Sequence, residues 1–255
     1  MPIQIIPKAQ QATGAFNGGE ITENKPVGLP REGGVLRPYS SVFYWAHADA
    51  HVDSTIGLHP HQGFEILSFV LAGTIRHYDT KLDDWRELHA GDVQIIRAGN
   101  GISHAEWMGR GSQMFQIWLD PNLNDTLNDP ASYDDYAAAS FPVRKRDTME
   151  EQILIGDNAP LSLKTPGVRI SRYRILQKTW RLELDPELTY GIYQLAGRSR
   201  ADGHIFETRD FVRVTNESVI EFIDCADAEF FVLAVPTRLD YLTYAARMRY
   251  STTEE

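Results

Sequence analysis

The chain has 255 residues, enough to bury a large core in one or two domains, and 42% of them are hydrophobic. Its 25 Lys and Arg residues against 35 Asp and Glu residues give a formal net charge of −10. A surface of this sign repels phosphate backbones, so direct nucleic-acid binding is disfavoured, and a single cysteine (Cys225) excludes an intramolecular disulfide. Without a signal-peptide pattern or an apolar run of membrane-spanning length, we expect a soluble, cytoplasmic protein.

The first half of the chain has the pattern of an all-β protein. Residues 1–40 contain scattered Gly and Pro, which predicts loops and short strands. Short runs of β-branched and aromatic residues follow, separated by turns that contain Gly, Asp or Asn. These runs predict strands over residues 42–46, 65–71, 74–78, 85–88, 93–97, 104–108 and 113–119.

The pattern changes over residues 121–149, which predict a linker with one or two helical turns and a solvated basic cluster at 144–146. Residues 239–250 have helical composition. Between these two segments, strands are predicted over residues 169–176, 179–184, 190–196, 211–214, 219–222 and 229–235. Two β-rich halves of similar length predict tandem antiparallel β-barrels, with a domain at 1–140 and a second at 141–255.

Two motifs with two-residue spacing predict a metal site. His59 and His61 are separated by one residue, as are His104 and Glu106. Alternate residues of an extended strand point to one face, so three imidazoles and a carboxylate can meet in a small barrel. This ligand set suits Fe(II), Mn(II), Ni(II), Cu(II) or Zn(II) better than Mg or Ca, and leaves about two octahedral positions open for substrate and O2 or water. Glu106 is also the candidate catalytic base.

Other side chains near these motifs are weaker candidates. We interpret Glu65, four positions after His61, as a group that supports the ligands rather than a ligand itself. Aromatic residues at the barrel mouth can line a slot for a flat substrate, although each of them alone suits the core equally well. The aromatic candidates are Phe43, Trp45, Phe64 and Trp107. Four further histidines, interpreted as structural, are His47, His51, His77 and His89.

Three stretches of the sequence closely resemble the pirins, a branch of the cupin superfamily. The stretches are H-P-H-x-G-F-E at 59–65, G-D-V-Q at 91–94 and A-G-x-G-I-x-H-x-E at 98–106, extended by Q-I-W-L at 116–119. The resemblance is specific over residues 40–120 and weaker beyond. It implies a bicupin of two jelly-roll-type barrels, with one metal ion, often iron, held by the four ligands named above. Gln62 stands where pirins frequently have arginine, which removes a fixed positive charge beside the site.

The resemblance implies two functions of different classes. Many bacterial pirins resemble quercetin 2,3-dioxygenases, which predicts a metal-dependent dioxygenase that opens a flavonol-like substrate with O2. Fe(II) is then the expected metal, with Mn, Ni, Co, Cu or Zn as alternatives. Animal relatives act as nuclear iron-containing transcriptional co-regulators, so the alternative is a non-enzymatic or redox-sensing regulator that acts through a protein partner. The second half has one histidine, His204, which predicts no second metal centre there.

Overall fold

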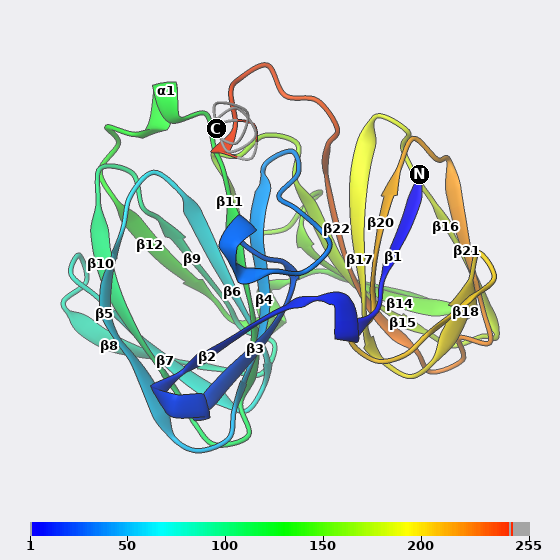
Figure 1. Ribbon diagram of the computed structural model, residues 1–255, viewed down its shortest axis with the longest axis horizontal. Coiled ribbons are helices and arrows are strands. Elements are labelled where there is room, and N and C mark those ends of the chain that lie inside the picture. The colour runs from blue at the N-terminus through cyan, green and yellow to red at the C-terminus, as the bar shows by residue number, and fades with distance from the viewer. Residues whose placement is uncertain (1, 245, 247–255) are drawn as a thin grey trace. The chain divides into compact units, whose positions relative to one another are not determined.

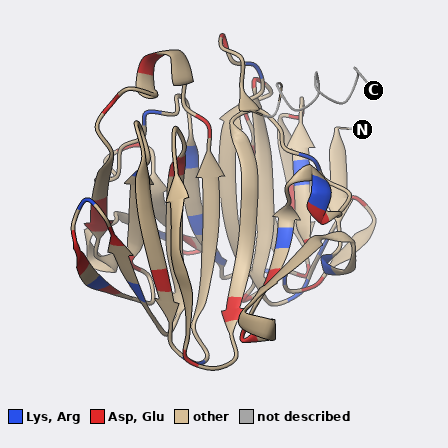
Figure 2. Cartoon of the chain, turned by 60° about the vertical axis from the view of Figure 1, so that its left-hand side comes forward, with Lys and Arg blue, Asp and Glu red and all other residues tan. Residues whose placement is uncertain are grey.

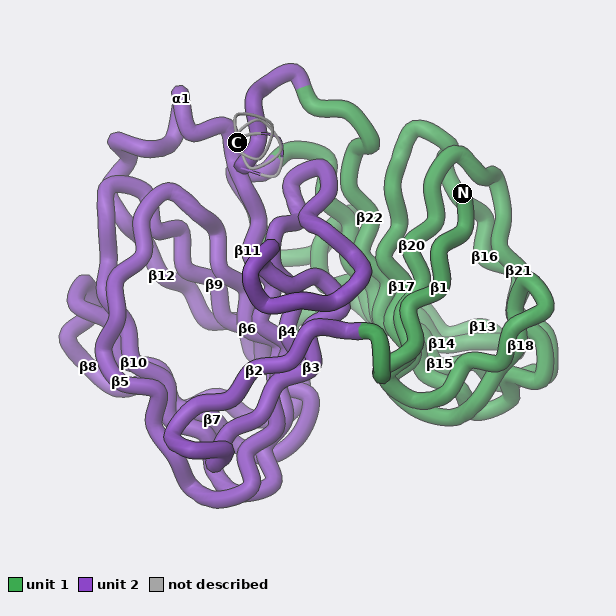
Figure 3. Tube along the Cα trace, in the orientation of Figure 1, with its two compact units in different colours: residues 1–10, 139–162, 166–239 green, residues 11–138, 163–165, 240–255 purple. Residues whose placement is uncertain are grey.

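The computed structural model describes residues 2–244 and 246 and folds into antiparallel β-sheets (Figure 1). The chain divides into two compact units, coloured separately in Figure 3. Unit 1 comprises residues 1–10, 139–162 and 166–239, and unit 2 comprises residues 11–138, 163–165 and 240–255. Each unit contains one seven-stranded and one four-stranded sheet. The predicted all-β, two-barrel architecture is therefore confirmed, whereas the division at residue 140 stays a prediction.

Unit 2 contains the motifs singled out in the sequence. Its larger sheet has the order β12-β9-β6-β11-β4-β3-β2 and its smaller sheet the order β5-β10-β7-β8. The strands of the larger sheet are β2 (Ala12–Phe16), β3 (Ile21–Val27), β4 (Val42–Ala50), β6 (Glu65–Ala72), β9 (Val93–Arg97), β11 (Gln113–Leu119) and β12 (Ser132–Tyr136). Those of the smaller sheet are β5 (Ser54–His61), β7 (Thr74–Asp79), β8 (Asp84–His89) and β10 (Ile102–Met108). One short helix, α1, spans Leu123–Thr126.

Unit 1 has the same division into a large and a small sheet, with orders β1-β20-β17-β22-β15-β14-β13 and β16-β21-β18-β19. The larger sheet contains β1 (Ile3–Ile6), β13 (Val143–Arg146), β14 (Met149–Ile155), β15 (Arg169–Ile175), β17 (Leu188–Ala196), β20 (Phe211–Thr215) and β22 (Glu229–Pro236). The smaller sheet contains β16 (Thr179–Glu183), β18 (Ser199–Ala201), β19 (His204–Phe206) and β21 (Val219–Ile223). The short 3-10 helices of the chain are Lys8–Gln10, Asn17–Gly19, Pro30–Glu32 and Ala138–Ser140.

The apolar side chains of alternate strand positions form the cores. In unit 2, Ile75 of β7 and Met108 of β10 pack with Met114 of β11, so this core joins the two sheets. In unit 1 the core is rich in aromatic residues, including Trp180 and Phe222, with Cys225 fully buried beside them. Burial of this much apolar surface is the main stabilising contribution in each unit.

Glycine permits a tight connection between β6 and β7. Gly73 has φ of 72°, and a Cβ at this position would lie 2.5 Å from Ser112 Oγ and 2.9 Å from Ser112 Cα. Only glycine fits such a close approach in the left-handed region. The turn therefore sets the start of β7 opposite β10, and this register positions the candidate site.

The predicted linker over residues 121–149 is wrong in part of its length. The expected helical turn is present as α1, but the segment also contains β12, β13 and the start of β14. Strand β13 tolerates its basic cluster because Lys145 forms an ion pair of 3.0 Å with Glu150, and Arg144 lies 3.8 Å from Glu151, both across the strand pair. Of the helix predicted over 239–250, residues 245 and 247–250 lie outside the described residues.

Charged residues of both signs are interspersed on the face shown in Figure 2, where acidic positions mark α1 and several loops. Among the residues that the structure describes, no helix combines the length and apolar character needed to cross a bilayer.

Candidate metal centre

The pairing of β10 with its two neighbours gathers the predicted ligands. His104 lies opposite His59 of β5 on one side and opposite Asp79 of β7 on the other. Glu106 lies opposite His77. Residues directly opposite one another in an antiparallel pair project from the same face of the sheet, and so do alternate residues of one strand. The register therefore sends all these side chains to one face of the smaller sheet, whose strands β5, β7, β8 and β10 are labelled in Figure 1.

His59, His61 and His104 form a close cluster. The ring centroids of His59 and His104 are 4.4 Å apart, and those of His61 and His104 are 4.8 Å apart. One ring nitrogen from each histidine lies within 4.8 Å of the other two. The Nε2 atoms of His59 and His104 approach to 2.9 Å. The sequence-based prediction of three converging imidazoles therefore agrees with the geometry.

The protonation of these rings suits metal binding. His59 Nδ1 donates a hydrogen bond of 2.8 Å to the carbonyl oxygen of Gly57, so the lone pair of the neutral ring lies on Nε2, the atom that faces His104. His61 Nε2 is buried and has no hydrogen-bond partner among the described residues. Burial, then His104 and His59, lowers the pKa of His61 to about 3. Burial, then His59, lowers the pKa of His104 to about 2. Neutral imidazoles of this kind fit a divalent transition-metal ion.

Glu106 follows His104 along β10, where the pairing with β5 contains a bulge between these two residues. The side chain is buried, and both carboxylate oxygens accept hydrogen bonds of 2.9 Å from Gln116 Nε2. Burial raises the pKa of Glu106, while His77 and the Gln116 hydrogen bond act in the opposite direction. The cluster of close ring nitrogens comprises the three histidines and does not include Glu106. The role of Glu106 as the fourth ligand therefore stays a prediction.

Two residues of β11 that contact the candidate ligands were not identified from the sequence as site residues. Gln116 contacts Glu106, and its Oε1 accepts a hydrogen bond of 2.9 Å from Trp118 Nε1. The Trp118 ring packs edge-on against His61, with centroids 5.1 Å apart. Their two-residue spacing in a predicted strand placed them on one face, but nothing in the sequence indicated which face opposes the histidines.

His77, predicted to be a structural histidine, lies beside the cluster. It is fully buried, with its ring centroid 5.5 Å from that of His104. His77 Nε2 lies 2.9 Å from a carboxylate oxygen of Asp79, and the Tyr133 ring stacks on the His77 ring with centroids 4.6 Å apart. Burial lowers the pKa of His77, and the hydrogen bond to Asp79 opposes this effect. The residue therefore belongs to the wall of the metal centre.

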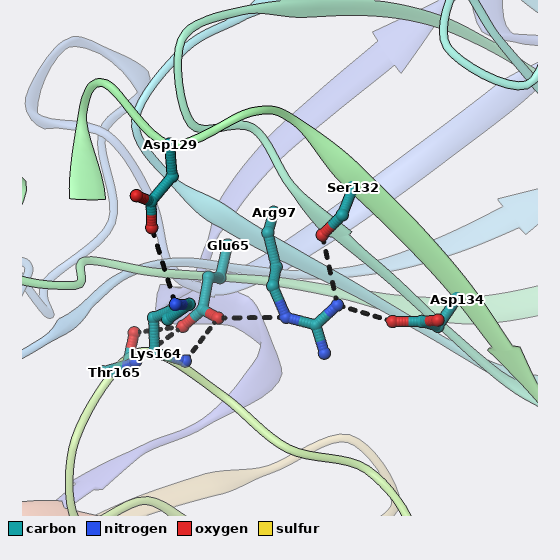
Figure 4. Close-up of polar contacts among 7 residues, drawn as sticks. All are labelled: Glu65, Arg97, Asp129, Ser132, Asp134, Lys164 and Thr165. Atoms are coloured by element: carbon teal, nitrogen blue, oxygen red, sulfur yellow. Dashed lines mark hydrogen bonds and ion pairs between the residues drawn. The ribbon is translucent and has the colours of Figure 1, made fainter.

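Glu65 has a different set of partners from the one expected. Its oxygens accept hydrogen bonds from the backbone N–H groups of Lys164 and Thr165, at 2.7 and 2.8 Å, and from Thr165 Oγ at 2.6 Å (Figure 4). Arg97 Nε lies 3.8 Å from the same carboxylate. The structure thus places Glu65 as an anchor for residues 163–165 within unit 2, and its described contacts do not include the histidine cluster.

The four aromatic candidates are also engaged elsewhere. Phe43 and Trp45 are fully buried, and Phe43 packs on Phe64 with ring centroids 4.4 Å apart. Trp107 points away from the site because it alternates with Glu106 along β10. Its ring lies on the outer face of the sheet beneath Arg76, whose guanidinium is 4.6 Å from the ring centroid.

A hollow of about 560 Å³ borders the cluster at His61. This volume is within the range of small-molecule sites in proteins. Its lining is mostly uncharged and polar, and none of the four aromatic candidates contributes to it. The lining residues are Pro60, His61, Gln62, Thr80, Asn100, Gly101, Ile102 and Ser103.

Comparisons with known proteins agree with this geometry. Residues 36–119 match the Pirin family model. The chain is 28% identical over 188 residues to a putative quercetin 2,3-dioxygenase of Pasteurella multocida, covering 69% of this chain and 74% of that protein. It is 26% identical over 187 residues to the quercetin 2,3-dioxygenase of Escherichia coli K12, covering 71% and 76%.

Solved structures show the same fold. A nickel(II) complex of the bacterial pirin YhhW from Escherichia coli superposes with a TM-score of 0.77 at 20% identity, covering 92% of this chain and 100% of that chain. A quercetin 2,3-dioxygenase from Acinetobacter baumannii superposes with a TM-score of 0.79 at 20% identity, covering 99% and 87%. Residues 36–119 are thus similar to the pirins in sequence, and the chain as a whole has the fold of the solved bacterial pirin.

Proposed function

We propose that this protein is a metal-dependent dioxygenase that opens the ring of a flavonol-like substrate with O2. The observation that carries the proposal is the convergence of three histidines beside a hollow large enough for a small aromatic molecule. Relatives named quercetin 2,3-dioxygenases, at 26–28% identity over about 70% of the chain, support the choice of reaction.

His59, His61 and His104, with Glu106, are the residues that would hold the metal ion. We expect Fe(II), and Mn, Ni, Co, Cu or Zn would fit the same donor set. When bound, such an ion supplies Lewis-acid stabilisation of a deprotonated substrate hydroxyl and access to the redox chemistry of O2. With three neutral imidazoles and one carboxylate around a divalent ion, the centre has a net charge of about +1, which favours an anionic oxygen of the substrate.

Glu106 is the candidate base for the flavonol 3-hydroxyl. Its burial raises its pKa, so the ionised carboxylate is a stronger base than an exposed glutamate. A proton taken from the 3-hydroxyl would rest on a carboxylate oxygen that Gln116 already contacts. Proton removal at this position converts the substrate into the anion that the centre binds.

The hollow beside His61 suits a neutral polyphenol. Gln62, Thr80, Asn100 and Ser103 can each donate and accept hydrogen bonds, which matches phenolic hydroxyl groups. Gln62 donates to the backbone oxygen of Asn100 at 3.4 Å and introduces no charge. A substrate with a carboxylate at this end would find no fixed cation among these lining residues.

Oxygen uptake with quercetin tests the proposal. The metal-free protein is loaded separately with Fe, Mn, Ni, Co and Cu, and flavonol absorbance is followed together with O2 consumption. We expect turnover with at least one metal and none with the His104→Ala variant. Stoichiometric metal binding without turnover for every metal would refute the enzymatic proposal. Capture of a protein partner that depends on the oxidation state of the metal would then support the regulatory alternative.

A further inference from the structure

Gln116 connects the two facing sheets of unit 2 at the candidate metal centre. It lies on β11 of the larger sheet, between Ser68 of β6 and Ala46 of β4, and so occupies a fixed central position. From there its amide reaches Glu106 on β10 of the smaller sheet and contacts both carboxylate oxygens at 2.9 Å. Gln116 is 8% exposed and Glu106 is 2% exposed, so water competes little for this contact.

Trp118 determines which end of the Gln116 amide faces Glu106. An indole N–H can only donate a hydrogen bond, and Trp118 Nε1 donates to Gln116 Oε1 at 2.9 Å. The amide oxygen is thereby directed to Trp118 and the amide NH2 to Glu106. An inverted amide would place two acceptors against each other at Glu106 and two donors against each other at Trp118. The order Trp118, Gln116, Glu106 therefore has one favourable arrangement.

The Trp118 ring is itself held by its neighbours. It stacks on Tyr44 with ring centroids 4.4 Å apart and meets Phe43 edge-on at 5.8 Å. His61 is a further aromatic neighbour of Trp118, at 5.1 Å and nearly perpendicular. One side chain thus contacts a candidate ligand directly and a second candidate ligand through Gln116.

We propose that Gln116 and Trp118 are positioning residues of the metal centre, with Trp118 orienting the Gln116 amide, Gln116 orienting the Glu106 carboxylate, and the Trp118 ring limiting rotation of His61. The inference rests on the proposed metal centre and adds the residues that determine its affinity and ligand field. Groups that orient metal ligands in this way typically change metal affinity about 10- to 100-fold when they are removed.

Titration of the metal-free full-length chain with Co(II), followed by visible absorption, tests this inference. We expect Gln116→Leu to raise the Kd by about 10- to 100-fold and to shift the Co(II) absorption bands. Trp118→Phe keeps a ring beside His61 but removes the N–H donor, so it should raise the Kd by about 3- to 10-fold, as expected for one neutral hydrogen bond. If Trp118 acts through Gln116, the double variant should bind no more weakly than Gln116→Leu alone.

Gln113→Leu is a matched control. Gln113 lies on the same strand and also donates to a carboxylate, Asp49 Oδ1 at 2.9 Å, but Asp49 is not a candidate ligand. This variant should keep the Kd within about twofold and leave the spectrum unchanged. Circular dichroism checks that each variant is folded. If Gln116→Leu fails to fold, Trp118→Phe still decides the outcome through its Kd and spectrum.

Each result of the titration distinguishes the inference from the proposed function. If Gln116→Leu and Trp118→Phe keep the parental Kd and spectrum while His104→Ala loses Co(II) binding, the positioning roles are overturned and the metal centre stands. Multiplicative effects in the double variant would overturn the serial order from Trp118 to Gln116. Parental Co(II) binding by His104→Ala would overturn the metal centre and the inference with it.

Discussion

The Glu65 anchor is expected to make a large contribution to the stability of unit 2. Glu65→Ala would leave the N–H groups of Lys164 and Thr165 and the Thr165 hydroxyl without their acceptor. Hydrogen bonds to a charged group contribute about 1.5–3 kcal/mol each. Relief of the desolvation of the buried carboxylate offsets part of this loss. The net cost should be about 3–5 kcal/mol, the usual cost of breaking a buried charged network.

Two measurements check this value. Urea unfolding should show a midpoint lowered by about 1–2 M if the denaturant dependence is about 2–3 kcal/mol/M. Hydrogen exchange should show loss of protection at the amides of residues 164 and 165, because these lose their acceptor directly. Glu65→Gln retains one acceptor oxygen and should cost less than Glu65→Ala.

The control for this experiment is an exposed carboxylate. Glu87 forms an ion pair of 2.8 Å with Arg76, but the two side chains are 42% and 50% exposed. Glu87→Ala should therefore change stability by no more than about 0.5 kcal/mol. A cost below about 1 kcal/mol for Glu65→Ala, with exchange protection retained at residue 165, would refute the anchoring role.

Three further predictions concern the metal centre. His61→Ala and His104→Ala should abolish metal binding measured by elemental analysis, whereas His204→Ala in unit 1 should leave the metal content unchanged. Loss of metal from His204→Ala would contradict a single site. Metal at about 100 times its Kd should stabilise the parent by about 2.7 kcal/mol and leave the melting of His104→Ala unchanged. The pKa of His104 is about 2 in the folded protein and near 6.5 in the unfolded chain. Between pH 7 and 5 the unfolded chain therefore binds a proton at this residue that the folded protein does not bind, and acidification favours unfolding. His104 alone should therefore cost the metal-free protein about 2 kcal/mol between pH 7 and 5, and His104→Ala should lose correspondingly less than the parent over the same range.

The grouping of the candidate ligands along their strands was predictable from the sequence because its determinants are local. Alternation along a strand is enough to place His59 with His61 and His104 with Glu106, and the structure brings the three histidines together. Strands with a clear apolar period were predicted for the same reason. Strand β12 was not, because its consecutive acidic residues Asp134 and Asp135 obscure the alternation of buried and exposed positions.

The remaining features of the site depend on contacts that sequence spacing does not encode. Gln116 meets Glu106 only because two sheets face one another, and Glu65 finds its partners about 100 residues later in the chain. Trp107 is the exception, because the alternation along β10 that places His104 with Glu106 already indicates that Trp107 lies on the outer face. Register and sheet pairing, rather than composition, therefore decide which polar and aromatic residues reach the site.

The pairing of β1 with β20 has a consequence for synthesis of the chain. Ile3 pairs with Val214, so β1 completes its sheet only after more than 200 further residues have been made. At about 5–20 residues per second this delay is roughly 10–40 s. During that time β1 has an unpaired backbone edge, which is a template for wrong pairing. Expression at lower temperature or with a chaperone that shields the nascent N-terminus should therefore increase the yield of folded protein, and a variant without residues 1–7 should lose this dependence.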